Sequence, residues 1–187
     1  FAGKDQVRQQ AAMWQAMLMS AGLKPSDKIV IHGFLNTKGQ KISKSLGNFI
    51  TPQEMVERYG QEATRAILAG VNQFEDTEVN IGVEGEGFDL TYNSNLVNGL
   101  GNQVSRIMTL AQTNLDEPVN VPEWEDMSDY FSYLNKFEVK NALDYVWKKV
   151  WALDKKIQDA KPWESKDKTL ISELVLALYT IARMLSP

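Results

Sequence analysis

The stretch KIVIHGFLNTKGQKISKSLGN, residues 28–48, joins a short apolar run to a basic segment that contains two glycines. Its first part, KIVIHGFL, is continuous in apolar and β-branched side chains, which is typical of a strand buried on both faces of a parallel α/β sheet. Lys38 and Gly39 then favour a tight hairpin turn. The stretch therefore predicts a buried strand that leads into a short, positively charged hairpin.

The residues before this strand predict a helix. Residues 4–21 are rich in good helix formers, carry apolar side chains at three-to-four spacing, and are followed by Gly22, which can end the helix. The opening FAGKD has the character of a strand end and a turn. Strand, helix and strand in this order predict that residues 1–50 are a remnant of a Rossmann-type parallel sheet.

Two short helices are expected after the basic segment. In TPQEMVERYG, Thr51 can cap the first helix, Pro52 suits its first position, and Glu54 completes a capping box. The second helix covers QEATRAILAGV. The acidic, glycine-rich NQFEDTEVNIGVEGEG that follows predicts a loop and the main boundary of the chain. We expect residues 51–85 to form a helical connector.

From Phe88 onward the pattern predicts an all-α bundle over residues 86–187, so that the chain is mostly helical overall. Residues 139–157 carry apolar side chains at alternating spacings of four and three, and residues 168–185 are apolar on most faces and should lie centrally. A shorter helix is expected near MSDYFSYLN. The first apolar stripe of the bundle comprises Leu96, Leu100, Val104, Ile107 and Ala111.

Composition limits the possible functions. The net charge of −4 argues against a general electrostatic surface for nucleic acid or membrane, so any contact with a polyanion must be local. With no cysteine and one histidine, no metal site is expected. No run approaches the roughly 18 apolar residues of a membrane span, and a soluble, cytoplasmic protein is expected. Because the chain opens on FAGKD and stops at ARMLSP, we expect a piece of a longer protein.

The basic segment carries the chemistry. Lys41, Ser43, Lys44 and Ser45, set between glycines, supply ammonium and hydroxyl donors to a polyanion. A phosphate chain undergoing transfer is a natural partner, because that reaction needs mainly charge stabilisation from the protein. The alternative is a solvated lysine-rich hairpin, which composition alone favours.

The order of residues favours the first interpretation. KISKS, preceded by HGF and followed by LGN, resembles the KMSKS signature of class I aminoacyl-tRNA synthetases, which activate an amino acid with ATP and transfer it to tRNA. The resemblance implies that Lys44 stabilises the transition state of adenylate formation, with Lys41 and Ser43 assisting. It also implies ATP with Mg²⁺ and no zinc site in this part of the protein. The ATP-binding residues would be Lys44, Lys41, Ser45, Asp5 and His32.

Within that class, GKDQVRQQAAMWQAML resembles a helix of the methionyl-tRNA synthetases, and the likeness extends over essentially all 187 residues. It implies that Asp5 contacts the ATP ribose and that Trp14 and Gln10 line the methionine pocket. Packing in a core is the alternative for Trp14. Gln10 stands where the family has histidine, which leaves another amino acid open.

The second half carries a separate resemblance. NGLGNQVSRI is similar to the family's anticodon-binding helix, so Asn102 and Arg106 would read the anticodon, and LDKKIQDAKPW is similar to the segment whose tryptophan, here Trp163, stacks on it. A solvated Asn102 and a Pro-Trp plug in the bundle are the alternatives. The implied domains are the end of the catalytic domain (1–50), a connector that contacts the tRNA stem (51–85), and an anticodon-binding domain shortened at its C-terminus (86–187).

The resemblance as a whole implies a fragment of a methionine-tRNA ligase that acts on methionine, ATP and a tRNA with the anticodon CAU, without a membrane partner. The class I fold needs an HIGH-type motif, and His32 is the only histidine, so we expect the fragment to be inactive alone. Two alternatives remain open: another class I synthetase, cysteinyl or branched aliphatic, and a non-catalytic tRNA-binding module.

Overall fold

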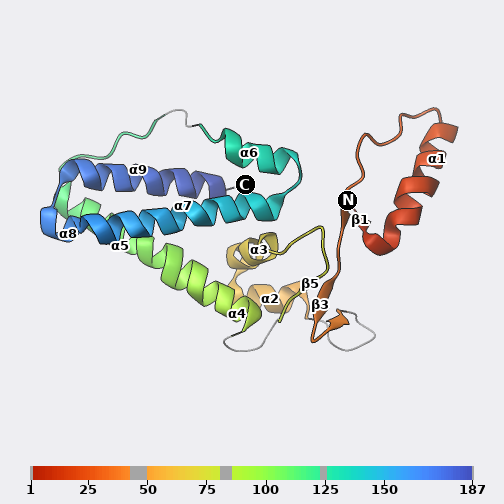
Figure 1. Ribbon diagram of the computed structural model, residues 1–187, viewed down its shortest axis with the longest axis horizontal. Coiled ribbons are helices and arrows are strands. Elements are labelled where there is room, and N and C mark those ends of the chain that lie inside the picture. Colours follow the sequence, from red (N-terminus) through yellow and green to blue (C-terminus); the bar gives the residue numbers. More distant parts are fainter. Residues whose placement is uncertain (1, 43–49, 81–85, 123–125, 187) are drawn as a thin grey trace. The chain divides into compact units, whose positions relative to one another are not determined.

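Figure 1 presents the computed structural model of the protein, which describes residues 2–42, 50–80, 86–122 and 126–186. The chain divides into two compact units, Phe1–Phe88 and Asp89–Pro187. The division falls just after the acidic, glycine-rich segment. The further separation of residues 1–50 from a connector over residues 51–85 stays a prediction.

The first unit begins with the predicted strand, helix and strand. Strand β1 pairs in parallel with β2, with Ala2 opposite Ile31 and Gly3 opposite His32. The connecting segment is helical, and Gly22, with φ of 70°, follows its last turn. The elements are β1 (Ala2–Gly3), the 3₁₀-helix η1 (Lys4–Gln6), the π-helix η2 (Gln9–Met13), α1 (Trp14–Ser20) and β2 (Ile31–His32).

The hairpin after β2 is as predicted. Strand β3 (Leu35–Thr37) pairs antiparallel with β4 (Gln40–Lys41). Lys38 and Gly39 at its tip have φ of 51° and 73°, and positive φ at both central residues is what a type I′ turn requires. A positive φ favours glycine, and Lys38 adopts a positive φ here at some cost in conformational energy.

The single buried strand expected over KIVIHGFL is wrong in extent. The run is interrupted between β2 and β3, and Ile31 and Leu35 are only half-buried. At the interruption the Gly33 N–H donates to Gln73 O over 2.9 Å, and the Phe34 N–H donates to Asp76 Oδ1 over 2.8 Å. The two N–H groups therefore find their acceptors in residues 73–76, which are not a strand, and the strand is interrupted at this point.

A short strand lies within the segment that was predicted to be all loop. Strand β5 (Thr77–Glu78) pairs in parallel with β3 and gives the order β4-β3-β5. Its acidic composition gave no strand signal, since strand propensity depends strongly on tertiary context. The pairing brings the segment 72–78 against the hairpin.

Both predicted short helices are present, as α2 (Pro52–Tyr59) and α3 (Gln61–Ala69). The capping box is complete: the Glu54 N–H donates to Thr51 Oγ1 over 3.1 Å, and the Thr51 N–H donates to Glu54 Oε2 over 2.6 Å. The two helices pack on one another, with Met55, Tyr59 and Ile67 buried.

The second unit is a helical bundle in which α9 packs against both α5 and α7, while α6 packs on α7 (Figure 1). This confirms the central place predicted for residues 168–185, since Ile171 and Leu174 are fully buried together with Ile107, Val146 and Ile157. The elements are α4 (Gly87–Thr91), the π-helix η4 (Tyr92–Gly101), α5 (Asn102–Asn114), α6 (Ser128–Asn135), α7 (Val139–Ala160), α8 (Pro162–Ser165) and α9 (Lys168–Leu185).

The first apolar stripe of the bundle differs from its prediction. Ile107 is buried as expected, whereas Val104 is 38% exposed and Gln103 is buried in its place. The π-helix that precedes α5 has more residues per turn than an α-helix, so residues beyond it are rotated from the faces that α-helical spacing assigns. The buried Gln103 side chain donates from Nε2 to Val150 O over 2.7 Å, while its Oε1 has no hydrogen-bond partner among the described residues.

Candidate functional site

A cluster of charges surrounds the ring of Phe34 in the first unit. Lys41 Nζ lies 3.6 Å from the ring centroid, and Lys4 Nζ lies 4.6 Å from it. Lys41 Nζ is also 3.2 Å from Asp5 Oδ2, and Lys4 forms an ion pair with Asp76. Each lysine therefore has a carboxylate and an aromatic face as partners, which orients both cations. The first helical turn, the hairpin and the segment before β5 meet at this cluster.

Asp76 ties this cluster together. Its hydrogen bond from Lys4 and the one from the Phe34 backbone N–H lower the pKa of its carboxyl group, so that it is ionised at neutral pH. Sequence reasoning missed both Lys4 and Asp76 as members of the site. The only available signal was the acidic composition of the segment after α3, and composition does not reveal which carboxylate meets the hairpin.

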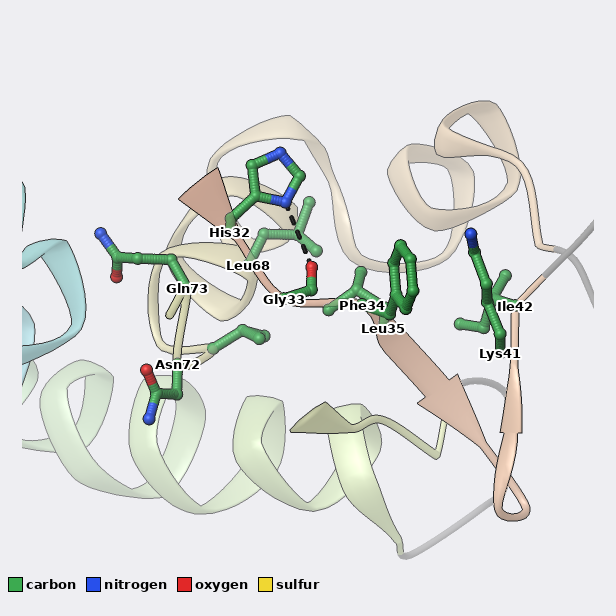
Figure 2. Close-up of a pocket in the computed structure, with 10 residues that line it drawn as sticks. His32, Gly33, Phe34, Leu35, Lys41, Ile42, Leu68, Asn72 and Gln73 are labelled. Carbon is green, nitrogen blue, oxygen red and sulfur yellow. Dashed lines mark hydrogen bonds between the residues drawn. The ribbon is translucent and has the colours of Figure 1, made fainter. Parts of the chain in front are cut away.

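A cavity of about 490 Å³ adjoins the cluster (Figure 2). Phe34 and Lys41 lie together on one side of it, and His32 and Gln73 lie towards the other. His32 Nδ1 is 3.1 Å from Gly33 O, which can only accept, so the ring donates there. The wall is mainly apolar, with the Lys41 ammonium at its edge. The lining residues are His32, Gly33, Phe34, Leu35, Lys41, Ile42, Leu68, Val71, Asn72 and Gln73.

Gly33 allows the wall to form. A Cβ added there would lie 2.2 Å from Glu75 O and 2.7 Å from Asp76 N. The backbone of the segment before β5 therefore passes too close for any side chain at this position. Close approach of two backbones is a recurrent reason for glycine in a strand pattern.

The structure brings together some of the sequence-predicted residues of the first unit. Asp5 contacts Lys41 directly, and His32 and Lys41 line one cavity. Ser43, Lys44 and Ser45 lie outside the described residues.

The residues predicted for the amino-acid pocket, Gln10 and Trp14, lie on the helical segment that follows β1. Trp14 is 47% exposed, and Gln10 is half-buried with its carbonyl accepting from Gln15 Nε2 over 2.8 Å. Neither residue lines the cavity of Figure 2. At this exposure Trp14 is not packed in a core of the described residues, which was the alternative to the pocket role. The roles of Gln10 and Trp14 stay predictions.

In the second unit, Arg106 and Trp163 come together, although 57 positions separate them in the sequence. The Arg106 guanidinium lies 5.5 Å from the Trp163 ring centroid, and its Nη1 lies 3.7 Å from Asp154 Oδ1 on α7. A cavity of about 400 Å³ is lined by Ser105, Arg106, Thr109, Leu110 and Trp163. Asn102 is exposed on α5, one turn before Arg106, and does not line this cavity.

Trp163 is held outward by the turn between α7 and α9. Lys161 adopts a left-handed conformation with φ of 42°, and Pro162 starts α8 and is buried. The Lys166 N–H closes the turn by donating to Pro162 O over 3.0 Å. Proline thus plugs the bundle, while the Trp163 ring remains 42% exposed. An exposed ring beside a guanidinium is suited to stacking on an unpaired base.

Asp154 is a further residue of this site that sequence reasoning missed. Its carboxylate orients the Arg106 guanidinium and offsets its charge. No local signal identifies it, because α7 carries several exposed acids and only the packing of α5 near α7 selects this one.

The described ranges contain neither a candidate metal cluster nor a candidate membrane span. No group of three or more histidine, aspartate or glutamate side chains there could hold a metal ion. No helix in the same ranges is long and apolar enough to cross a membrane.

Comparison with known proteins gives one consistent family. A family model described as tRNA synthetases class I (M) matches residues 1–108. The methionine–tRNA ligase of Fusobacterium nucleatum is 33% identical to the chain, and the match covers 99% of this chain and 32% of that protein. The methionine–tRNA ligase of Caldanaerobacter subterraneus is 34% identical, and the match covers 98% of this chain and 30% of that protein. It spans about a third of the length of these curated relatives.

Solved structures agree with the family model. One is the structure of Mycobacterium tuberculosis methionyl-tRNA synthetase bound by methionyl-adenylate, with a TM-score of 0.78 and 27% sequence identity. The match covers 98% of this chain and 39% of that chain. A leucyl-tRNA synthetase of Agrobacterium radiobacter, at a TM-score of 0.66 and 17% identity, shares the fold. The predicted fold class, an α/β remnant followed by a helical bundle, is confirmed.

Proposed function

The chain belongs to the class I tRNA synthetases, whose M family model matches residues 1–108, and we propose that it is part of a cytoplasmic methionine–tRNA ligase. In the proposed reaction the carboxylate of methionine attacks the α-phosphate of ATP and displaces pyrophosphate. A hydroxyl of the terminal adenosine of tRNA then attacks the carbonyl carbon of the resulting methionyl-adenylate and displaces AMP. Mg²⁺ would accompany ATP, bound chiefly by its phosphate oxygens. The first unit would supply activation and the second would read the anticodon.

The geometry around Phe34 supports the activation role. A largely apolar cavity with Lys41 at its edge suits a nucleotide, whose base is flat and whose phosphates are anionic. Asp5 beside Lys41 presents a carboxylate that can accept from sugar hydroxyls. Lys44, with Lys41 and the two serines, would stabilise the charge that develops on the departing pyrophosphate.

The convergence of Arg106 and Trp163 is the observation that carries the recognition role. The two residues derive from separate motifs and meet at one cavity with the ring exposed. The ring would stack on an unpaired base, and Arg106 would donate to its edge. A CAU anticodon is the proposed sequence, and Asn102, one turn away on α5, would contact a neighbouring base.

The identity of the amino acid can be tested in the intact protein. With methionine, we expect ATP–pyrophosphate exchange at least about 100-fold more efficient, in kcat/KM, than with cysteine, leucine or valine, because a pocket distinguishes substrates by the groups that it can pair. Steady-state exchange assays with each amino acid would measure this ratio. A preference for cysteine or a branched aliphatic amino acid would assign the protein to another synthetase, and Gln10 would then be the first residue to examine.

Trp163→Ala tests the recognition role. The variant is expected to bind a CAU stem-loop about 5- to 100-fold more weakly, because base stacking on an aromatic side chain is worth about 1 to 3 kcal/mol. Fluorescence anisotropy with labelled RNA would measure the dissociation constant, and far-UV circular dichroism would check the fold. Trp163→Phe, which keeps an aromatic face, should restore most of the affinity. Equal binding by wild type and Trp163→Ala would refute the anticodon role.

A further inference from the structure

A second exposed tryptophan lies in the same unit as Trp163. Trp151 on α7 is 61% exposed, more than any other large hydrophobic side chain described in that unit. Val150 and Leu153, which lie near it on α7, are buried in the bundle. The Trp151 ring is therefore accessible on the surface of α7, and the residues around it decide what it can bind.

The surroundings of Trp151 are cationic. Lys148 precedes it by three residues and Lys155 follows it by four, so both share its helix face. Both lysines are exposed, and within the described ranges neither forms an ion pair. The acids of this face, Asp144 and Asp154, are paired with Lys140 and Arg106. A local positive charge thus surrounds one aromatic ring in a chain whose net charge is −4.

Trp151 lies on the part of α7 that contacts the helix carrying Arg106. Gln103 of α5 donates to Val150 O over 2.7 Å, and Arg106 of α5 pairs with Asp154 at 3.7 Å. Trp151 lies between these two contact points on α7, about 4.5 Å along the helix axis from Asp154. A ring at this spacing is within reach of the nucleotide next to one held at Arg106.

We propose that Trp151, flanked by Lys148 and Lys155, is a second stacking platform that binds an unpaired nucleotide of the RNA loop beside those read at Arg106 and Trp163. The inference rests on the proposed anticodon function and extends its footprint. A base would stack on the ring while the lysines meet the phosphates on either side of it. A single ring among lysines fits a nucleotide better than a protein partner, which would need a contiguous apolar patch.

The test measures binding of the 187-residue chain to a CAU stem-loop by fluorescence anisotropy. Trp151→Ala is expected to weaken binding about fivefold or more, whereas Trp151→Phe should bind like wild type, because any aromatic face stacks. Phe131→Ala is the matched control: this ring on α6 is 46% exposed, and its removal should leave affinity unchanged. An unchanged affinity for Trp151→Ala would overturn the proposal.

The salt dependence of RNA binding distinguishes the contribution of the two lysines from that of the Trp151 ring. Replacing Lys148 and Lys155 together by glutamine should reduce the slope of log K against log salt by about 1.4, at about 0.7 for each phosphate contact with a single strand. Trp151→Ala should leave that slope unchanged. If Trp151 had only a structural role, the two variants would not differ in this way. An unchanged slope in the double-lysine variant would contradict the proposed phosphate contacts.

The position of the nucleotide can be located with abasic substitutions placed one at a time through the RNA loop. One substitution is expected to weaken binding to the wild type without weakening binding to Trp151→Ala.

If Trp163→Ala weakens binding and Trp151→Ala does not, the second platform is refuted while the anticodon role stands. If Trp163→Ala binds normally, the anticodon role itself fails. A dimer that depends on Trp151 in sedimentation velocity, with RNA binding unaltered, would replace the proposal by a protein interface.

Discussion

Replacing Lys44 by alanine in the intact ligase is expected to slow formation of the aminoacyl-adenylate by about 100-fold or more, with a much smaller change in the affinity for ATP. The negative charge that the side chain would meet develops mainly as the bond to pyrophosphate breaks. An interaction that is stronger in the transition state than in the ground state lowers the rate constant when it is lost, and it alters binding little.

Single-turnover formation of adenylate at a range of ATP concentrations would separate the rate constant from the dissociation constant. Lys38→Asn is the matched control, because it removes a lysine six positions earlier in the sequence, and asparagine tolerates the positive φ of 51° at this position. We expect Lys38→Asn to behave like wild type. Loss of ATP affinity without loss of rate in Lys44→Ala would instead give Lys44 a ground-state binding role.

Lys41→Ala is expected to have a mixed effect. In the structure Lys41 already contacts Asp5 and the face of Phe34, so Lys41→Ala would remove contacts within the first unit as well as a cation for the phosphates. A slower reaction in that variant would have two causes. The comparison of the two alanine variants would show how much of the Lys41 effect is structural.

The features predicted correctly from the sequence depend on neighbouring residues. The turn at Lys38 and Gly39 follows from two residues, and the capping box of α2 follows from Thr51 and Glu54. The apolar faces of α9 are a property of one helix. Local signals of this kind are independent of how distant segments pack.

The features that were missed depend on distant segments. The interruption between β2 and β3 occurs because Gly33 and Phe34 bond to Gln73 and Asp76, about 40 residues away. Likewise, Val104 was placed on the buried stripe because the π-helix before α5 leaves no clear mark in the sequence. No pattern in a single sequence encodes such long-range contacts.

In the candidate sites too, some residues were predictable from local sequence and others only from the packing of distant segments. Resemblance to a family pointed to Arg106 and Trp163, but their partner Asp154 emerged only from the packing of α5 near α7. Asp76, which holds Lys4 and the Phe34 backbone, also has no motif of its own. Motifs identify groups that act on ligands, whereas the residues that orient them are found through geometry.

The largest effect on the fold is expected from Gly33→Ala. Its Cβ would lie 2.2 Å from a backbone oxygen, which cannot move aside as the end of a flexible side chain could. Relief requires the segment before β5 to separate from β3. We expect the free energy of unfolding of the first unit to fall by about 3 kcal/mol, at the upper end of the usual cost of overpacking.

Hydrogen exchange would localise the change. The amides of Gly33, Thr77 and Val79, which donate to Gln73 O, Phe34 O and Asn36 O, should exchange faster in Gly33→Ala, while the amides of α7 and α9 keep their protection. Gly39→Asn is the control, because it adds a side chain of a type that accepts positive φ where no atom lies within 4 Å. Displacement of Glu75 would also move Asp76 away from Lys4, so the variant should lose adenylate formation together with stability. Exchange rates like those of wild type would mean that the two backbones do not approach as closely as Gly33 implies.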